Sequence, residues 1–271
     1  MAYPEDYPDD LTKAKAQGYL HKHMAVLVDG TTGIPVYNPS TGLGADLLGW
    51  WDASHTSRII GSPGVSTWID AVAGYNMLQA TPASQPVYSA TSFNGAPGLT
   101  FDGVDDFLNM ESMPFPTGAA PSEVWALAQN TALAADTATR IVMSYGGSTV
   151  SQTVRRIYRT VSAGVNRAGA TTGDGASGIT TADMNVDLSS RHLLRAAYGA
   201  TATTLYADGI VTGPTAVVPG TAALRARFGA STASTPGAFW QGQIAAILIT
   251  NPLSVAKAAA LHSWLMARRN V

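Results

Sequence analysis

Two closely spaced tight turns constrain the fold of this chain more than any other feature. Asn94-Gly95 leads into a short apolar strand at Leu99–Phe101, and Asp102-Gly103 then precedes a second strand that begins at Phe107-Leu108. Asn-Gly and Asp-Gly pairs between apolar runs are strong signals for β-hairpins, because both residues of each pair tolerate a positive φ. The stretch therefore predicts antiparallel strands joined by tight turns.

Short strands separated by glycine, proline, asparagine or aspartate recur from residue 47 onward. The better candidates are Leu47–Asp52, Val65–Ile69, Val124–Ala128, Ile141–Ser144, Arg156–Thr160, His192–Tyr198, Thr203–Ala207 and Ile244–Ile249. Many short strands with regular turn signals are typical of a sandwich or jelly roll. Adjacent Trp50 and Trp51 must point to opposite faces of their strand, so we expect one of them to face solvent, the N-terminal segment or a partner. The glycine-rich segment Gly169–Gly178 is predicted to be a loop.

One helix is predicted, at the C-terminal end of the chain. From Val255 to Arg269, the large apolar residues Leu261, Trp264 and Leu265 share one stripe of helical spacing. A stripe of this size is poorly suited to water, so we expect the helix to pack back against the sheets. Arg269 is expected at the solvent end of the helix.

Several short motifs follow one another in order along the chain. They are Leu48–Ser54, Val65–Asp70, Leu78–Pro86, Phe101–Asp106, Arg191–Leu194 with Leu205–Gly209, Phe239–Ile249 and Trp264–Arg268. In this order they resemble the motifs of concanavalin A-like (laminin G-like) jelly-roll domains, especially those of bacteriophage virion proteins. The resemblance implies an all-β, two-sheet antiparallel jelly-roll sandwich over residues 46–271. Ala246 stands where the family usually has a glutamate.

Residues 1–45 differ from the rest of the chain. An acidic start rich in tyrosine and proline is followed by a strand-like segment, Met24–Val28, and by a passage rich in turns. A segment this short cannot bury a core of its own. It is either a frayed terminus or an extended arm that orders on a partner, and its tyrosines and apolar strand favour the arm. We expect residues 1–45 to attach the chain to other virion proteins, in capsid or tail, and we expect a homo-oligomer.

The weak charge of the chain excludes several classes of function. Charged residues make up 13% of the sequence, the net charge is −2, and there is no cysteine. Nothing here drives binding to nucleic acid, and the longest aliphatic run, Ile244–Ile249, is far shorter than the ~20 residues of a membrane span. The N-terminus lacks the apolar core of a secretory signal. We expect synthesis in the host cytoplasm and a final place on the virion surface.

The glutamates do not form the paired carboxylates that a glycosidase of this fold requires. The chain contains only Glu5, Glu111 and Glu123; Glu5 lies in the N-terminal segment, and neither Glu111 nor Glu123 has an acidic neighbour two or four positions further along. Polysaccharide lyases of similar fold carry a Gln-Ile-His strand, and Ala245 stands where that histidine belongs. We therefore predict no enzymatic activity, no catalytic residue and no cofactor. The alternative is a carbohydrate-active enzyme or a free lectin of the concanavalin A-like fold.

Asp102, Asp105 and Asp106 are the candidate metal ligands. Clustered carboxylates at a turn suit calcium, which the family resemblance also implies, but such side chains also cap their own backbone amides. Capping is the favoured interpretation and calcium is the alternative.

Arg155, Arg156 and Arg159 form the densest basic cluster of the chain. Strand alternation places Arg155 and Arg159 on one face and Arg156 on the other. We expect this cluster to contact an acidic partner or the N-terminal arm.

The pattern as a whole predicts a non-enzymatic structural protein of a bacteriophage virion. It would be a capsid decoration protein, a head fibre, or a tail fibre or other tail-associated adhesin, anchored by residues 1–45. The outward-facing jelly roll makes host-surface glycans the candidate ligands, by carbohydrate binding without turnover.

Overall fold

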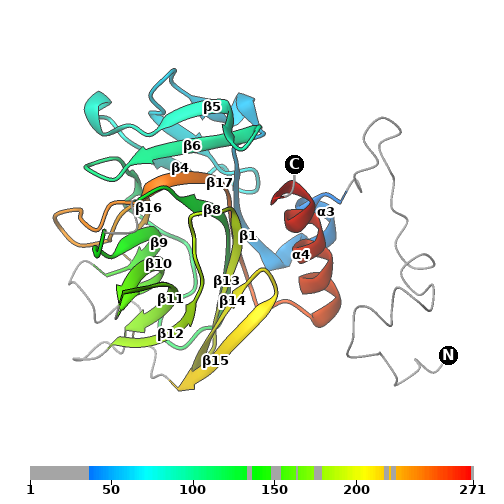
Figure 1. The fold of residues 1–271 in the computed structure, drawn as a ribbon. Helices are drawn as coiled ribbons and strands as arrows, with labels where there is room; N and C mark the ends of the chain where they lie inside the picture. The colour runs from blue at the N-terminus through cyan, green and yellow to red at the C-terminus, as the bar shows by residue number, and fades with distance from the viewer. Residues whose placement is uncertain are drawn as a thin grey trace. The chain divides into compact units, whose positions relative to one another are not determined.

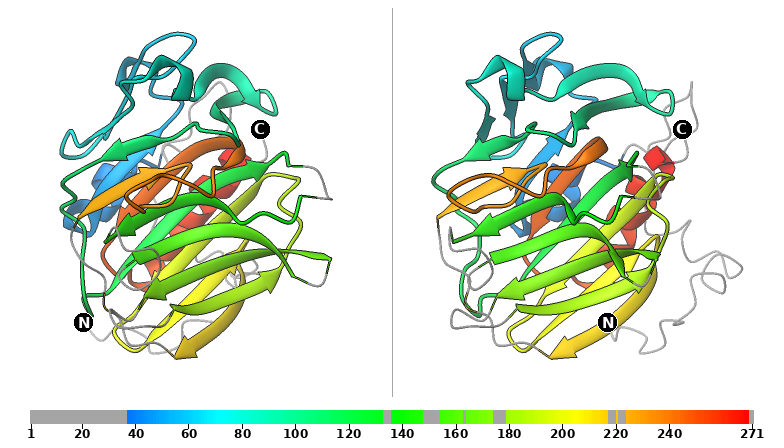
Figure 2. Two further views of the ribbon diagram at one scale, coloured as in Figure 1. Left: turned by 90° about the vertical axis from the view of Figure 1, so that its left-hand side faces the viewer. Right: turned by 60° about the vertical axis from the view of Figure 1, so that its left-hand side comes forward.

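The strands that follow residue 46 pair into two antiparallel sheets, which stack face to face as a sandwich (Figures 1 and 2). The computed structural model describes residues 37–132, 136–147, 154–162, 164–173, 179–216, 220 and 224–269. The predicted all-β sandwich with a C-terminal helix is thereby confirmed.

Each sheet has a continuous strand order. The first sheet comprises β15 (Ile210–Ala216), β14 (Ala202–Ala207), β13 (His192–Tyr198), β8 (Ser122–Asn130), β17 (Gln241–Thr250), β6 (Ala96–Asp102) and β5 (Val87–Phe93), with β1 (Leu47–Asp52) also paired to β17. The second comprises β12 (Ile179–Asn185), β11 (Val165–Gly173), β10 (Val154–Ser162), β9 (Arg140–Gly146), β16 (Arg225–Phe228), β7 (Leu108–Met110), β4 (Asn76–Leu78), β3 (Thr67–Ile69) and β2 (Ile59–Ile60). The helical elements are α3 (Pro39–Leu43), η1 (Gly44–Asp46), η2 (Thr56–Arg58), η3 (Pro82–Ser84) and α4 (Val255–Arg269).

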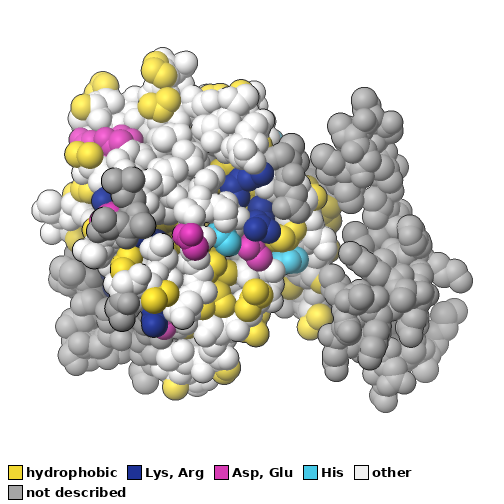
Figure 3. Space-filling model, viewed as in Figure 1, with side chains coloured by type: hydrophobic (Ala, Val, Ile, Leu, Met, Phe, Trp, Pro, Cys, Tyr) yellow, Lys and Arg dark blue, Asp and Glu magenta, His cyan; other side chains and the backbone are white. Residues whose placement is uncertain are grey.

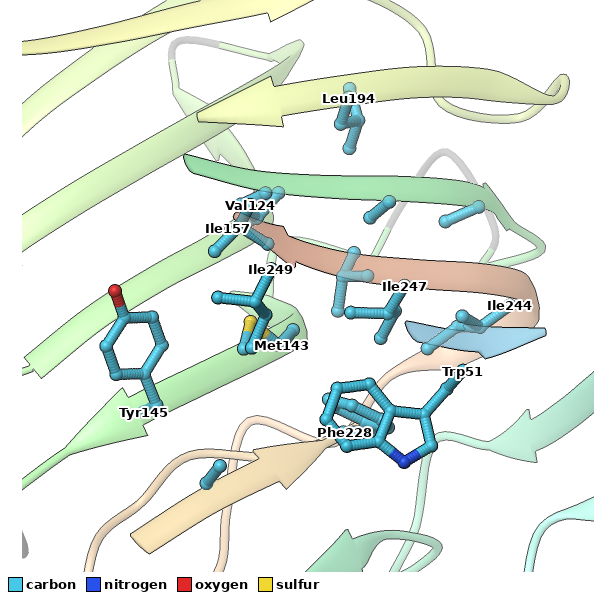
Figure 4. Packing of buried hydrophobic residues seen from close by; sticks show 14 of the residues in the cluster. Trp51, Val124, Met143, Tyr145, Ile157, Leu194, Phe228, Ile244, Ile247 and Ile249 are labelled. Atoms are coloured by element: carbon cyan, nitrogen blue, oxygen red, sulfur yellow. The ribbon is translucent and has the colours of Figure 1, made fainter. Parts of the chain in front are cut away.

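The two sheets bury a hydrophobic core between them (Figure 4). Trp51 of β1 lies in this core, with its ring edge-on to Phe228 at 5.0 Å and to Phe115 at 6.1 Å. Trp50 points to the opposite face of the strand, where its ring centroid lies 5.8 Å from that of Trp264 in α4. The prediction that the two tryptophans face opposite ways is confirmed. The outward one contacts the chain's own helix rather than solvent, the arm or a partner.

The helix α4 packs on the outer face of the first sheet. Its buried residues are Ala258, Leu261, Trp264 and Leu265. Both faces of the central strands are thus covered, which explains why the residues of β8 and of the C-terminal half of β17 are buried without alternation. At the end of α4, Arg268 Nη2 donates to Asp52 Oδ1 at 2.6 Å, and Arg269 Nε donates to the carbonyl of Arg191 at 2.6 Å. The expectation that Arg269 lies at a free solvent end is wrong.

The two tight turns of the opening stretch have different roles. Asn94 and Gly95 have φ values of +50° and +90° and join β5 to β6 within one sheet, as predicted. After Asp102 and Gly103, however, the chain crosses to β7 in the second sheet. The prediction of a second hairpin is therefore wrong. Its physical reason is that β6 already pairs with β5 on one side and β17 on the other, which leaves no position beside it for the next strand.

β11 occupies part of the region predicted to be a loop. Gly169 lies in the middle of this strand, and the Tyr158 ring of β10 packs directly over it. A Cβ on Gly169 would lie 2.3 Å from that ring, so close packing in a strand, rather than a turn, requires the glycine. The loop prediction is wrong for residues 169–173, and residues 174–178 lie outside the described residues.

The sandwich unit begins at Pro39, and its first residues already contact the helix α4. Leu43 is buried, and Lys257 Nζ donates to the Leu43 carbonyl at 3.0 Å and to Asp46 Oδ2 at 2.6 Å. Residues 1–36, most of the predicted arm over residues 1–45, lie outside the described residues, so the arm stays a prediction. In the part of the chain that the structure describes, no helix has the length and apolar character to cross a membrane.

Candidate functional site

The three aspartates predicted as calcium ligands do come together at the turn between β6 and β7. Asp102, Asp105 and Asp106 each offer a carboxylate oxygen, and these oxygens lie within 4.8 Å of one another. Asp102 Oδ1 accepts a hydrogen bond from Val104 N at 2.8 Å, and Asp106 Oδ2 accepts one from Asp102 N at 2.9 Å. Ser84 Oγ donates to Asp105 Oδ2 at 2.8 Å. The capping bonds expected from the sequence are therefore present, and calcium binding stays a prediction.

Asp106 is the buried member of this trio. Burial raises the pKa of its carboxyl to about 6; the hydrogen bond from Asp102 N opposes this rise, and the nearby charges of Asp102 and Asp105 add to it. A cation at the turn would favour the ionised carboxylate, because an opposite charge lowers a carboxyl pKa. Protonation of Asp106 and binding of a cation are therefore expected to compete.

The basic cluster of β10 does not form an outer surface for an acidic partner. Arg155 is 0% exposed and Arg159 is 2% exposed, on the same face of the strand as the core residue Ile157. Arg155 Nη1 donates to Ser122 Oγ at 2.7 Å and to Tyr145 Oη at 3.2 Å. The expectation of a partner contact is wrong for these two arginines, because the face of β10 that carries them points into the sandwich.

A polar pocket opens at one end of the sandwich, where β8 ends and β10 turns into β11. It has a volume of about 150 Å³. The lining residues are Asn130, Ala132, Arg159, Asn166, Asp187, Leu188 and Ser189. Asn130 comes from the first sheet, Arg159 and Asn166 come from the second, and the remaining polar groups come from the segment between β12 and β13. The pocket therefore exists only when the two sheets are stacked, and no local motif in the sequence could have indicated it.

Arg159 braces the inner wall of this pocket. Its Nε and Nη2 donate to Asn166 Oδ1 at 3.2 and 2.7 Å, and its Nη1 donates to the carbonyls of Asp136 at 2.6 Å and Ala138 at 3.3 Å. The Asp136 carboxylate lies 3.7 Å away. Burial lowers the pKa of Arg159, while the charge of Asp136 raises it. The guanidinium thus acts mainly as a structural brace.

Asp187 provides the exposed charge at the mouth of the pocket. Its Oδ1 accepts from Ser189 N at 3.0 Å, and its Oδ2 accepts from Ser189 Oγ at 2.9 Å. These two bonds hold the pKa of Asp187 below its usual value. Asn166 Nδ2 lies 3.4 Å from Asp187 Oδ1, a long contact that a ligand can replace. A carboxylate beside an amide can both accept from and donate to the hydroxyl groups of a ligand.

A chain of three side chains adjoins the pocket on the far side of Asp187. Ser190 Oγ lies 3.0 Å from His192 Nε2, and His192 Nδ1 lies 2.7 Å from Asp208 Oδ2. This is the order of contacts found in a Ser-His-Asp catalytic triad. The sequence carries no nucleophile motif at Ser190, so only the structure reveals this arrangement. Figure 3 shows acidic, basic and histidine side chains gathered over this region, where the first sheet meets α4.

His192 Nε2 is shared between two oxygens and is not held by Ser190 alone. It lies 2.8 Å from the carbonyl oxygen of Asp187, which can only accept a hydrogen bond, and 3.0 Å from Ser190 Oγ. When Nε2 carries a proton and donates it to this carbonyl, it cannot take a proton from Ser190. Asp208 is further shared with Arg269 Nη2 at 3.2 Å. We assign His192 as a positioning residue that holds the backbone of the segment lining the pocket.

The two glutamates within the described residues are both paired with arginines. Glu123 of β8 is buried and lies 2.7 Å from Arg195 Nη2, and Glu111, which follows β7, lies 3.3 Å from Arg225 Nη2. Glu123 lies in a strand of the first sheet, and Glu111 directly follows a strand of the second. They do not form the facing carboxylate pair of a glycosidase.

The fold is similar to part of a sialidase and part of a neurotoxin binding domain. The Trypanosoma rangeli sialidase, solved with the inhibitor DANA, matches with a TM-score of 0.54 and 15% identity over 93% of this chain and 38% of the sialidase. The botulinum neurotoxin serotype D binding domain matches with a TM-score of 0.57 and 8% identity over 85% of this chain and 54% of that chain. No protein-family model matches the chain, and no curated protein matches it in sequence. The chain thus shares a β-sandwich fold with part of each of these proteins.

Proposed function

We propose that this chain is a non-enzymatic bacteriophage virion protein whose sandwich binds host-surface glycans. In this proposal it is a capsid decoration protein, head fibre or tail-associated adhesin, attached through residues 1–45. The ordered motifs that resemble those of virion jelly rolls support this setting. The low fraction of charged residues, 13%, also suits a protein packed into an assembly.

The polar pocket is the observation that carries the glycan-binding part. Asp187, Asn166, Asn130 and Ser189 present neutral and acidic hydrogen-bonding groups around a small opening, which suits the hydroxyl groups of a sugar. One structural neighbour, the Trypanosoma rangeli sialidase, was also solved with sialic acid, which makes glycans the ligand class to test first.

The site favours binding over turnover. Glu111 and Glu123 are paired with arginines in separate sheets, and the Asp187 carbonyl competes with Ser190 for His192 Nε2. These arrangements support a binding protein over the alternative of a carbohydrate-active enzyme.

The test measures retention and turnover on the same polysaccharides. The full chain is run through gels that contain purified host-surface polysaccharide, and reducing ends and unsaturated sugars are assayed in parallel. We expect slowed migration without sustained release of products. Asp187→Ala should abolish the retention, whereas Asp183→Ala, which removes a half-buried carboxylate of β12 paired with Arg167, should preserve it. Sustained release would establish an enzyme, and unaltered migration with every polysaccharide would contradict glycan binding.

A further inference from the structure

We propose that the pocket selects an uncharged sugar, whose hydroxyl groups bind to Asp187 and Asn166, and that it rejects sugars bearing a carboxylate, including sialic acid. The inference rests on the proposed glycan-binding function and adds to it the chemical class of the ligand. Three features of the pocket carry it: a cation already engaged by the protein, an exposed anion, and a small volume.

The cation of the pocket is already committed to the protein. Arg159 is 2% exposed, and its hydrogen bonds to Asn166 Oδ1 and to the carbonyls of Asp136 and Ala138 use four of the five N–H groups of a guanidinium. A guanidinium that binds a ligand carboxylate through two hydrogen bonds needs two free N–H groups on the same side. Arg159 therefore cannot serve as the carboxylate receptor that an acidic sugar requires.

The accessible charge of the pocket is negative. Asp187 is exposed and its carboxylate is held in place by Ser189 N and Ser189 Oγ. An ionised carboxylate only accepts hydrogen bonds, so it takes the O–H group of a sugar and repels a second carboxylate. Asn166 Nδ2, at 3.4 Å from Asp187 Oδ1, supplies a neighbouring donor. Together they match two adjacent hydroxyl groups, of which one donates and the other accepts.

The volume of the pocket limits how much of a glycan it holds. Its volume is only about 150 Å³. This room suits a single sugar unit or the end of a chain.

The test uses an array of glycan pairs, in which each neutral glycan stands beside its sialylated or uronic-acid-bearing form. We expect the full chain to bind at least one neutral glycan, and to bind its acidic form at least about tenfold more weakly. A difference of this size is typical of a hydrogen bond to a charged group. Asp187→Asn should weaken binding of the neutral glycan about tenfold. It should also reduce the difference in affinity between the neutral and the acidic glycan of a pair. Asp183→Asn is the matched control and should change neither value.

The outcomes separate this inference from the function on which it rests. A preference for the acidic members, or unchanged neutral binding in a folded Asp187→Asn variant, would overturn the inference and leave glycan binding intact. Binding to no glycan at all would refute the proposed function itself, and the inference with it. Thermal melting of each variant verifies that it is folded, and Ser189→Ala, which removes only the hydroxyl bond to Asp187, serves as a second, milder probe of the same carboxylate.

Discussion

Buried aspartates organise this sandwich at the scale of single residues. Asp70 Oδ1 accepts from Trp50 N at 2.6 Å, and Asp70 Oδ2 accepts from the backbone N–H groups of Ala73 at 2.6 Å and Gly74 at 3.1 Å. Asp52 accepts from Arg268 of α4. These aspartates belong to two of the motifs that carried the family resemblance. These two aspartates have a structural role. The motifs that contain them therefore predict the fold far better than they predict a binding site.

Asp106 gives the sandwich a defined dependence on pH. Its folded-state pKa of about 6 lies above the unfolded value of 3.8, so its protonated form contributes stability that is fully present below about pH 4 and is lost as the pH rises through about 6. Asp106→Asn keeps the shape without the titration. We expect its free energy of unfolding in urea to vary less between pH 4 and 6 than that of the wild type. Parallel curves for the two proteins would contradict this.

The titration of Asp106 also allows an experiment to distinguish calcium binding from turn capping. Calcium favours the ionised form of Asp106, so a calcium site at Asp102, Asp105 and Asp106 would stabilise the protein at pH 7 more than at pH 5. Capping alone predicts no response to calcium at either pH. Thermal melting with and without millimolar calcium distinguishes the two, with magnesium as the control for general ionic effects.

At the scale of elements, α4 is the part whose packing can be tested most simply. Trp264 contacts Trp50 across the outer face of the first sheet, and truncation of a buried tryptophan typically costs about 3–5 kcal/mol. We expect Trp264→Ala to lower the free energy of unfolding by about this amount. Ser263→Ala, one position earlier on the exposed side of the helix, should leave unfolding nearly unchanged. Equal stability of both variants would show that the helix contributes little to the fold.

The elements also show how far the sequence alone can reach. Strands β1 and β13 and the helix α4 have the predicted bounds, because strong apolar patterns between turn residues specify them locally. The sequence did not predict β11, because its alanines, threonines and glycines carry no strong local strand signal. Contacts with neighbouring strands, such as that of Tyr158 with Gly169, fix its position. The pocket lay beyond prediction for the same reason, since β8, β10 and β11 meet there only through the stacking of the sheets.

At the scale of the whole molecule, the boundary of the N-terminal arm can be tested by truncation. Deletion of residues 1–38 spares Leu43, whereas deletion of residues 1–45 removes it, and a buried leucine contributes about 1.5–3 kcal/mol. We expect the shorter deletion to melt like the full chain and the longer one to melt at a lower temperature. If the proposed attachment to a virion holds, both variants should fail to join the phage particle. Incorporation of the shorter deletion at normal occupancy would contradict the attachment role.

The most direct test of the account is a crystal structure of the protein with an oligosaccharide that it retains. We predict a single sugar unit in the pocket between the two sheets, with its hydroxyl groups on Asp187 and Asn166 and its glycosidic bonds intact. A sugar bound at another face of the sandwich, or a cleaved product beside Ser190 and His192, would contradict the account.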